Sequence, residues 1–239
     1  MKNDEIIKSF VTRDELNPKI WDSDDMLKNE VREKLLSSAG EFVDFLGVPI
    51  VVEDIIFTGS LSNYNWSKYS DIDLHIVADF KQFDDELLPL YEELFKVKKT
   101  LFNTDHDIKI FGYEVELYVQ DLHAAHFSSG VYSVLNNEWN NKPKKEKVQI
   151  DRNLIKEKSK QWMGITDTAI EAASDVTADD ARDIIKKCRE KLKKYRTCGL
   201  EKNGEYSDEN LVFKVLRRNG YIEKLINFEN DVVDKELSI

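Results

Sequence analysis

Apolar side chains recur along the chain with two periods, and this difference predicts an α/β part followed by a helical part. Between residues 23 and 46 the spacing is near-helical, with apolar side chains at Leu27, Val31, Leu35, Phe42 and Leu46. Ser23 is expected to cap this helix, and Gly47 with Pro49 to end it. The first 20 residues, which include Pro18, are expected to form an irregular arm.

Short apolar runs separated by polar loops predict strands in the middle of the chain. Residues 49–59 and 71–79 are expected to be two strands joined by the polar loop SLSNYNWSKYS. Two further strands are expected within residues 107–121, and a fifth within residues 130–135, before the polar loop NNEWNNKPKKEK. Residues 84–102 have the pattern of a helix.

From about Asp151 to the end, the pattern is helical. One helix is expected in residues 152–173, and a second is expected to be capped by Thr177 and closed by Gly199. Ser207 is expected to open a third helix, and a fourth is expected near the end of the chain. The sequence thus predicts an α+β fold: a mixed β-sheet flanked by helices in residues 1–150, and a C-terminal helical bundle in residues 151–239 that packs on it.

Charge and composition exclude some classes of protein. The net charge is −11, made of −14 in residues 1–141 and +3 in residues 142–239, which argues against a protein that coats long duplex DNA. No apolar run is long enough for a membrane span, and the N-terminus lacks the apolar core of a secretory signal. Cys188 and Cys198 form no disulfide framework or metal motif, so a cytoplasmic location is expected.

The candidate chemistry lies in the stretch FTGSLSNYNWSKYSDIDLHIV, where Asp71 and Asp73 stand one residue apart in an apolar strand. Strand alternation places both side chains on one face, with Cα atoms roughly 7 Å apart. That spacing can bracket two divalent cations about 3.5–4 Å apart, as in two-metal phosphoryl and nucleotidyl transfer. Upstream, Gly59 lets backbone amides approach a phosphate closely, and Ser60 adds a hydroxyl donor.

Gly59-Ser60, a spacer of ten residues and then Asp71-Ile72-Asp73 between apolar residues resemble the signature of the DNA polymerase beta-like nucleotidyltransferase superfamily. The motifs cover residues 50–120, and the expected order of elements suits that family. The segments LNPKIWD, VELYVQD and GVYSVLNNEW also resemble nucleotidyltransferases found in tailed-phage genomes. That resemblance would place the protein in a host cytoplasm.

The resemblance implies further site residues. In the family a third carboxylate from a later strand completes the metal site; Glu116, between Val115 and Leu117, fits that position best, and Glu114 is the alternative. Two Mg²⁺ or Mn²⁺ ions are implied on Asp71, Asp73 and Glu116. Basic side chains of the helical part, here Lys214 and Arg217, are implied to meet the triphosphate together with Gly59 and Ser60. The basic helix from Lys186 to Arg196 is expected to be mainly solvated, with one edge within reach of the triphosphate.

The resemblance therefore implies an enzyme that binds ATP or another nucleoside triphosphate and transfers a nucleoside monophosphate to an acceptor hydroxyl with release of pyrophosphate. The acceptor class stays open between a nucleotide, an RNA 3′ end, a small molecule and a protein. One alternative is a catalytically silent nucleotide-binding or interaction protein on the same scaffold, of the antitoxin or decoy type. Another is a purely structural virion or regulatory protein. The base and the oligomeric state are left undetermined.

Overall fold

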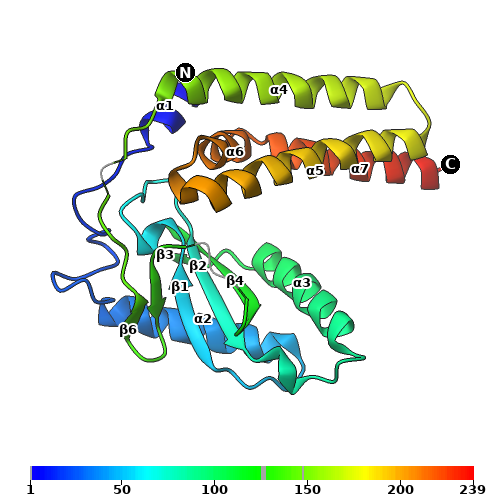
Figure 1. The fold of residues 1–239 in the computed structure, drawn as a ribbon. Coiled ribbons are helices and arrows are strands. Elements are labelled where there is room, and N and C mark those ends of the chain that lie inside the picture. The colour runs from blue at the N-terminus through cyan, green and yellow to red at the C-terminus, as the bar shows by residue number, and fades with distance from the viewer. Residues whose placement is uncertain (1, 125–127, 147) are drawn as a thin grey trace. The chain divides into compact units, whose positions relative to one another are not determined.

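The computed structural model describes residues 2–124, 128–146 and 148–239. The chain folds into two compact units, one formed by Val11–Lys147 and the other by Met1–Phe10 together with Val148–Ile239. The first unit is α/β and the second is helical (Figure 1). The expected fold class, a mixed sheet flanked by helices and followed by a helical region, is confirmed.

The described part of the α/β unit contains a mixed six-stranded sheet in the order β3-β4-β2-β1-β5-β6. β2 and β4 are parallel, whereas the other neighbouring strands are antiparallel. The strands are β1 (Asp54–Thr58), β2 (Ile72–Ala78), β3 (Lys109–Ile110), β4 (Tyr113–Asp121), β5 (Val131–Ser133) and β6 (Glu138–Asn141). The parallel pair β2 and β4 lies next to β1, so residues near 58, 73 and 116 become neighbours.

One face of this sheet packs on α2 (Asn29–Leu46) and α3 (Leu88–Asp105) and forms the core. Apolar residues alternate inward along β2, where Ile72, Leu74 and Ile76 are fully buried. Phe42 and Phe102 bring the two helices together at 5.1 Å between ring centroids. On the opposite face of the sheet, β2 carries Asp73 and His75, and β4 carries Glu116, Tyr118 and Gln120. All five of these polar side chains are half-buried, so this face can carry chemistry.

A side chain of α3 closes the outer edge of β4. The amide of Asn103 donates from Nδ2 to the carbonyl of Leu117 (3.0 Å) and accepts at Oδ1 from the Leu117 N–H (3.1 Å). It replaces the two backbone bonds that a further strand would make. Because β3 pairs with β4 only at residues 113 and 114, this amide supports the part of β4 that carries Glu116.

The helical unit consists of α1 (Lys2–Lys8), α4 (Arg152–Ser174), α5 (Ala178–Asn203), α6 (Asp208–Arg218) and α7 (Tyr221–Leu237). α4, α5, α6 and α7 pack against one another (Figure 1). Short 3₁₀ turns complete the chain at η1 (Ser60–Ser62), η2 (Phe80–Gln82) and η3 (Gly204–Tyr206). No helix in the described part of the chain is long and apolar enough to cross a bilayer.

Several expected helix ends are confirmed. Gly47 ends α2 with a left-handed φ of 71°. The hydroxyl of Thr177 accepts from the N–H of Asp180 at the start of α5, and that of Ser207 accepts from the N–H of Asn210 at the start of α6. These side chains satisfy backbone donors that a helix start leaves unpaired.

Other expectations are wrong, each for a local reason. Ser23 does not cap α2, which begins at Asn29, because the Asp22 carboxylate holds a turn by accepting from the amides of Asp24 and Met26. Gly199 does not close α5, which continues to Asn203. A Cβ at Gly199 would lie 2.5 Å from the Cβ of Glu209, so this glycine permits a close contact between α5 and α6.

Two segments expected to be irregular have regular structure. Within the loop predicted after residue 135, Glu138–Asn141 forms β6 and pairs with β5. In the expected N-terminal arm, Lys2–Lys8 forms α1, whose Ile6 and Ile7 are buried. The ammonium of Lys156 in α4 lies 2.6 Å from the carboxylate of Asp4, so tertiary contacts supply what a short helix lacks by itself. Met1–Phe10 thus groups with the helical unit, whereas the sequence had assigned residues 1–150 together.

Candidate functional site

The turn after β1 brings its backbone against the carboxylate of Asp73. Gly59 has φ 82° and ψ −162°, a conformation open essentially to glycine alone. A Cβ at this residue would lie 2.0 Å from Asp73 Oδ2 and 3.0 Å from Asp73 Cγ. The register agrees, because Thr58 pairs with Asp73 across β1 and β2. Glycine is therefore required here by both the backbone angle and the space.

Serine hydroxyls shape the same turn. Ser60 donates its hydroxyl hydrogen to the Ser70 hydroxyl at 2.7 Å, across the expected spacer loop. The hydroxyl of Ser62 contacts the carbonyls of Gly59 and Gly130, both at 2.9 Å. The N–H of Gly59 donates to the Ser128 hydroxyl at 3.3 Å, a long bond with an uncharged acceptor. Gly59 and Ser60 thus present polar groups at one end of the loop.

Two of the predicted carboxylates face each other on neighbouring strands. Asp73 of β2 and Glu116 of β4 are directly paired in the parallel register, and both are half-buried. Asp71 lies just before β2 begins at Ile72. Glu114 is exposed, and its carboxylate lies 3.9 Å from the ammonium of Lys109. The geometry therefore brings Glu116, rather than Glu114, beside Asp73.

Tyr118 lies between the two paired carboxylates, and the sequence had not singled it out. Its hydroxyl donates to Glu116 Oε2 and lies 3.5 Å from Asp73 Oδ1. Burial raises the pKa of this phenol far above its usual value, and the charges of Asp73 and Glu116 add to the rise. The neutral phenol is therefore a fixed hydrogen-bond donor to the carboxylates.

A second layer of polar groups continues along the same face. The ring of His75 stacks on that of Tyr118 at 4.8 Å between centroids. Its Nδ1 lies 2.6 Å from Gln120 Oε1, and its Nε2 lies 3.3 Å from Thr58 Oγ1. These contacts use both ring nitrogens. His75 therefore supports Tyr118 in the described structure.

Lys99 of α3 places a cation next to the carboxylates. Its ammonium lies 3.7 Å from the centroid of the Tyr118 ring. Burial lowers the pKa of Lys99, while attraction by Glu116 and Asp73 opposes that change. The two carboxylates thus attract a cation, as a metal-binding site requires, and here the protein's own ammonium responds to them.

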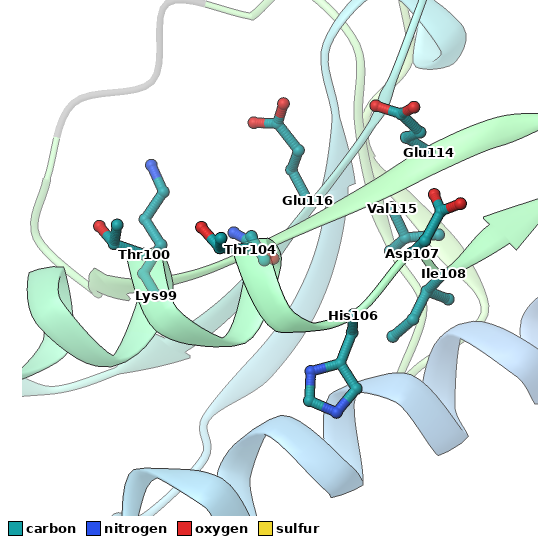
Figure 2. A pocket seen from close by; sticks show the side chains of 10 residues that line it. Lys99, Thr100, Thr104, His106, Asp107, Ile108, Glu114, Val115 and Glu116 are labelled. Atoms are coloured by element: carbon teal, nitrogen blue, oxygen red, sulfur yellow. The ribbon is translucent and has the colours of Figure 1, made fainter. Parts of the chain in front are cut away.

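A cavity of about 470 Å³ opens beside Glu116. Figure 2 shows Lys99 extending from α3 and Glu116 from β4 toward the same side, while His106 points away. The His106 ring stacks on Phe102 instead. The walls are mostly polar and include Thr100, Thr104 and Asp107. A polar small molecule has room next to the carboxylate pair.

The oxygen donors suit a hard divalent cation. Carboxylate oxygens are the ligands that Mg²⁺ prefers, with waters and substrate phosphates completing its shell. Over residues 2–124, 128–146 and 148–239, no group of three or more His, Cys, Asp or Glu side chains is arranged to hold a metal ion. In this structure the Asp73 and Glu116 carboxylates instead meet the Tyr118 hydroxyl and the nearby charge of Lys99.

Lys214 and Arg217 belong to α6 in the helical unit. Both are half-buried there and lie on the same helix. Their assignment to the triphosphate, like the catalytic assignment of Asp71, Asp73, Glu116, Gly59 and Ser60, stays a prediction.

Comparison with protein-family models finds no match, and comparison with curated proteins finds none either. Among solved structures, the chain is similar to "STING-associated CdnE c-di-GMP synthase from Capnocytophaga granulosa". The identity is 12%, the alignment covers 92% of this chain and 90% of that chain, and the TM-score is 0.22. A likeness of that size carries no argument about the site or the reaction.

Tyr118 and Lys99 are the site neighbours that sequence reasoning missed. Tyr118 had a signal, because residues 114, 116 and 118 alternate onto one face of a strand. Lys99 had none, because its position depends on how α3 packs on the sheet.

Proposed function

We propose that this protein is a metal-dependent nucleotidyltransferase that moves a nucleoside monophosphate from a nucleoside triphosphate to an acceptor hydroxyl. The observation that carries the proposal is the pairing of Asp73 with Glu116, with the Gly59 backbone against Asp73. Two carboxylates on rigid neighbouring strands beside a glycine turn suit phosphate chemistry, because the strands hold the oxygens and the turn gives a phosphate access.

Asp71, Asp73 and Glu116 would hold two Mg²⁺ or Mn²⁺ ions, which would neutralise charge on the triphosphate and lower the pKa of the acceptor hydroxyl. Gly59 N–H and the Ser60 hydroxyl would exchange their serine partners for oxygens of the β- or γ-phosphate. Phosphate oxygens are the stronger acceptors, because hydrogen bonds to charged groups are shorter and stronger.

In the transfer, the acceptor oxygen bonds to the α-phosphorus while the bond from that phosphorus to pyrophosphate breaks. Glu116 would take up the proton that the acceptor hydroxyl loses. Tyr118 would hold the Glu116 carboxylate in place through its hydroxyl. The cavity next to Glu116 would admit a polar acceptor, whose class is a nucleotide, an RNA end, a small molecule or a protein group. Lys214 and Arg217 are proposed for the triphosphate from the resemblance alone.

The test is pyrophosphate release from each common ribonucleoside triphosphate with Mg²⁺ or Mn²⁺, with products identified by mass spectrometry. We expect release by the wild-type protein and by Asp84→Ala/Asp85→Ala, which removes the same charge from exposed positions. We expect none from Asp71→Ala/Asp73→Ala. Glu116→Gln should lose release and Glu114→Gln should keep it, if Glu116 is the third carboxylate.

Three results would contradict the proposal. Release that survives in Asp71→Ala/Asp73→Ala would show that another site is responsible. No release from any triphosphate, combined with metal-dependent binding of a non-hydrolysable triphosphate in calorimetry, would favour a silent nucleotide-binding protein. The absence of both pyrophosphate release and triphosphate binding would contradict the proposed nucleotidyltransferase function.

A further inference from the structure

The helical unit contains a cavity of its own, of about 320 Å³, which is at the lower end of the range for small-molecule pockets. Its residues come from α4, α5 and α6, and most belong to one stripe of α5. Lys191, Lys194, Tyr195, Cys198 and Lys202 recur on that stripe at helical spacing. The nucleotidyl-transfer site uses none of them.

The lysines of this stripe are available to a ligand. Lys191, Lys194 and Lys202 are exposed and form no ion pair with the residues that the structure describes. Lys187 of the same helix differs, because its ammonium pairs with Asp183 at 2.9 Å. Unpaired ammoniums around one cavity create a local positive potential that favours an anion.

The floor of the cavity is aromatic. Trp162 of α4 is only 8% exposed, and its ring lies 5.1 Å from that of Tyr195. The buried Tyr195 hydroxyl has no hydrogen-bond partner of normal geometry among the described residues. A planar group can stack on such a floor, and a polar atom of a ligand would satisfy this hydroxyl.

One acidic side chain refines the ligand class. Glu209 of α6 lines the same cavity, and its carboxylate lies 3.9 Å from the ammonium of Lys158. It can accept a hydrogen bond from a hydroxyl or amino group. Gly199 makes room beside it, because a Cβ there would lie 3.0 Å from Glu209 Oε2.

We propose that this cavity binds a nucleoside phosphate through the lysines, the Trp162–Tyr195 floor and Glu209, without a metal ion. The ammoniums and the aromatic floor together favour a nucleoside phosphate over inorganic phosphate or a nucleoside alone. Inorganic phosphate would leave the aromatic floor unused, and a nucleoside would leave the ammoniums unpaired. The inference stands on the helical unit and does not rest on the proposed transfer reaction.

Cys198 provides the readout, because it lines the cavity while Cys188 is buried. The experiment measures alkylation of each cysteine by peptide mass spectrometry in EDTA, with AMP, adenosine or inorganic phosphate added to the full chain. We expect AMP to slow alkylation of Cys198 saturably, and adenosine and phosphate to do so only at higher concentrations. Alkylation of Cys188 reports general unfolding.

Charge variants test which lysines act. Lys191→Gln/Lys194→Gln/Lys202→Gln should raise the half-saturating AMP concentration about tenfold or more. Lys186→Gln/Lys187→Gln/Lys193→Gln removes the same charge from other positions of α5 and should leave it unchanged. Protection should persist in Asp71→Ala/Asp73→Ala.

The proposal is overturned if AMP gives no protection, or if both triple variants weaken protection equally. Equal protection by phosphate and AMP would show that the nucleoside does not contribute to binding, which would overturn the proposed ligand class. Loss of protection in Asp71→Ala/Asp73→Ala would show that AMP acts through the carboxylate pair, whereas failure of pyrophosphate release alone would leave this inference intact.

Discussion

Gly59 and Asp73 are in such close contact that a single added carbon at residue 59 would lie 2.0 Å from Asp73 Oδ2. Gly59→Ala is therefore expected to displace the Asp73 carboxylate and to reduce the proposed nucleotidyl transfer about 100-fold or more, because small misplacements at a reacting centre cost that much. It should also cost roughly 1–3 kcal/mol of unfolding free energy through the strained backbone. Pyrophosphate release and urea unfolding measure the two effects.

Gly112→Ala is the matched control. Gly112 also has a positive φ, 86°, but a Cβ there would meet nothing within 4 Å. It should lose roughly 1–2 kcal/mol of stability and retain activity. Equal activity in the two alanine variants would show that the contact with Asp73 is unimportant for transfer.

Tyr118→Phe should weaken the proposed metal binding by about 10–100-fold, since partners that orient ligand side chains commonly contribute that much. The hydroxyl that holds Glu116 is lost while the ring that stacks on His75 remains. Mn²⁺ titration followed by electron paramagnetic resonance measures the affinity directly. Tyr91→Phe, whose ring stacks on Phe83 elsewhere in the unit, is the control. Unchanged Mn²⁺ affinity in Tyr118→Phe would contradict the positioning role.

Lys99→Met should tighten Mn²⁺ binding about fivefold, because it removes a cation that competes for Glu116 and Asp73. An interaction of about 1 kcal/mol between partly exposed charges corresponds to that factor. Lys96→Met removes the same charge from an exposed position of α3, where Lys96 pairs with Glu93, and should change little. Weaker binding in Lys99→Met would instead indicate that this ammonium assists the site.

The raised pKa of Tyr195 predicts a loss of folding stability at alkaline pH. Burial raises the pKa of its phenol to about 12, and the charge of Glu209 adds to the rise. Because the folded-state pKa is raised above 10.0, the associated stability is fully present below pH 10 and is lost as the pH rises toward 12. Denaturant unfolding at several pH values should show this loss in the wild type and less of it in Tyr195→Phe. Identical pH profiles would contradict the assignment.

The strand pattern alone predicted much of the α/β unit. Strand alternation placed Asp71 and Asp73 on one face, and the fully buried Ile72, Leu74 and Ile76 of β2 occupy the other. The strand pattern could not predict the pairing of Asp73 with Glu116, because the sequence of a single strand does not determine which strand lies beside it. The preference for Glu116 over Glu114 came from resemblance, and the geometry adds the reason: only Glu116 lies opposite Asp73.

Helix ends were predictable where a side chain decides them, as at Thr177 and Ser207. They were not predictable where packing decides them. Gly199 has the residue type of a helix stop but serves a contact with Glu209 inside α5. Likewise, Lys2–Lys8 is too short to be helical by itself, and it packs on α4 and α6, whose residues lie more than a hundred positions away.

The amide of Asn103 has a consequence for how copies of the chain can associate. A strand that joins a sheet needs an open row of backbone N–H and C=O groups, which is how exposed edges promote aggregation and fibre growth. At Leu117 both groups are already taken by this one side chain. Strand addition to β4 at Leu117 would therefore require α3 to detach, so this helix protects the part of the sheet edge that carries the carboxylate pair.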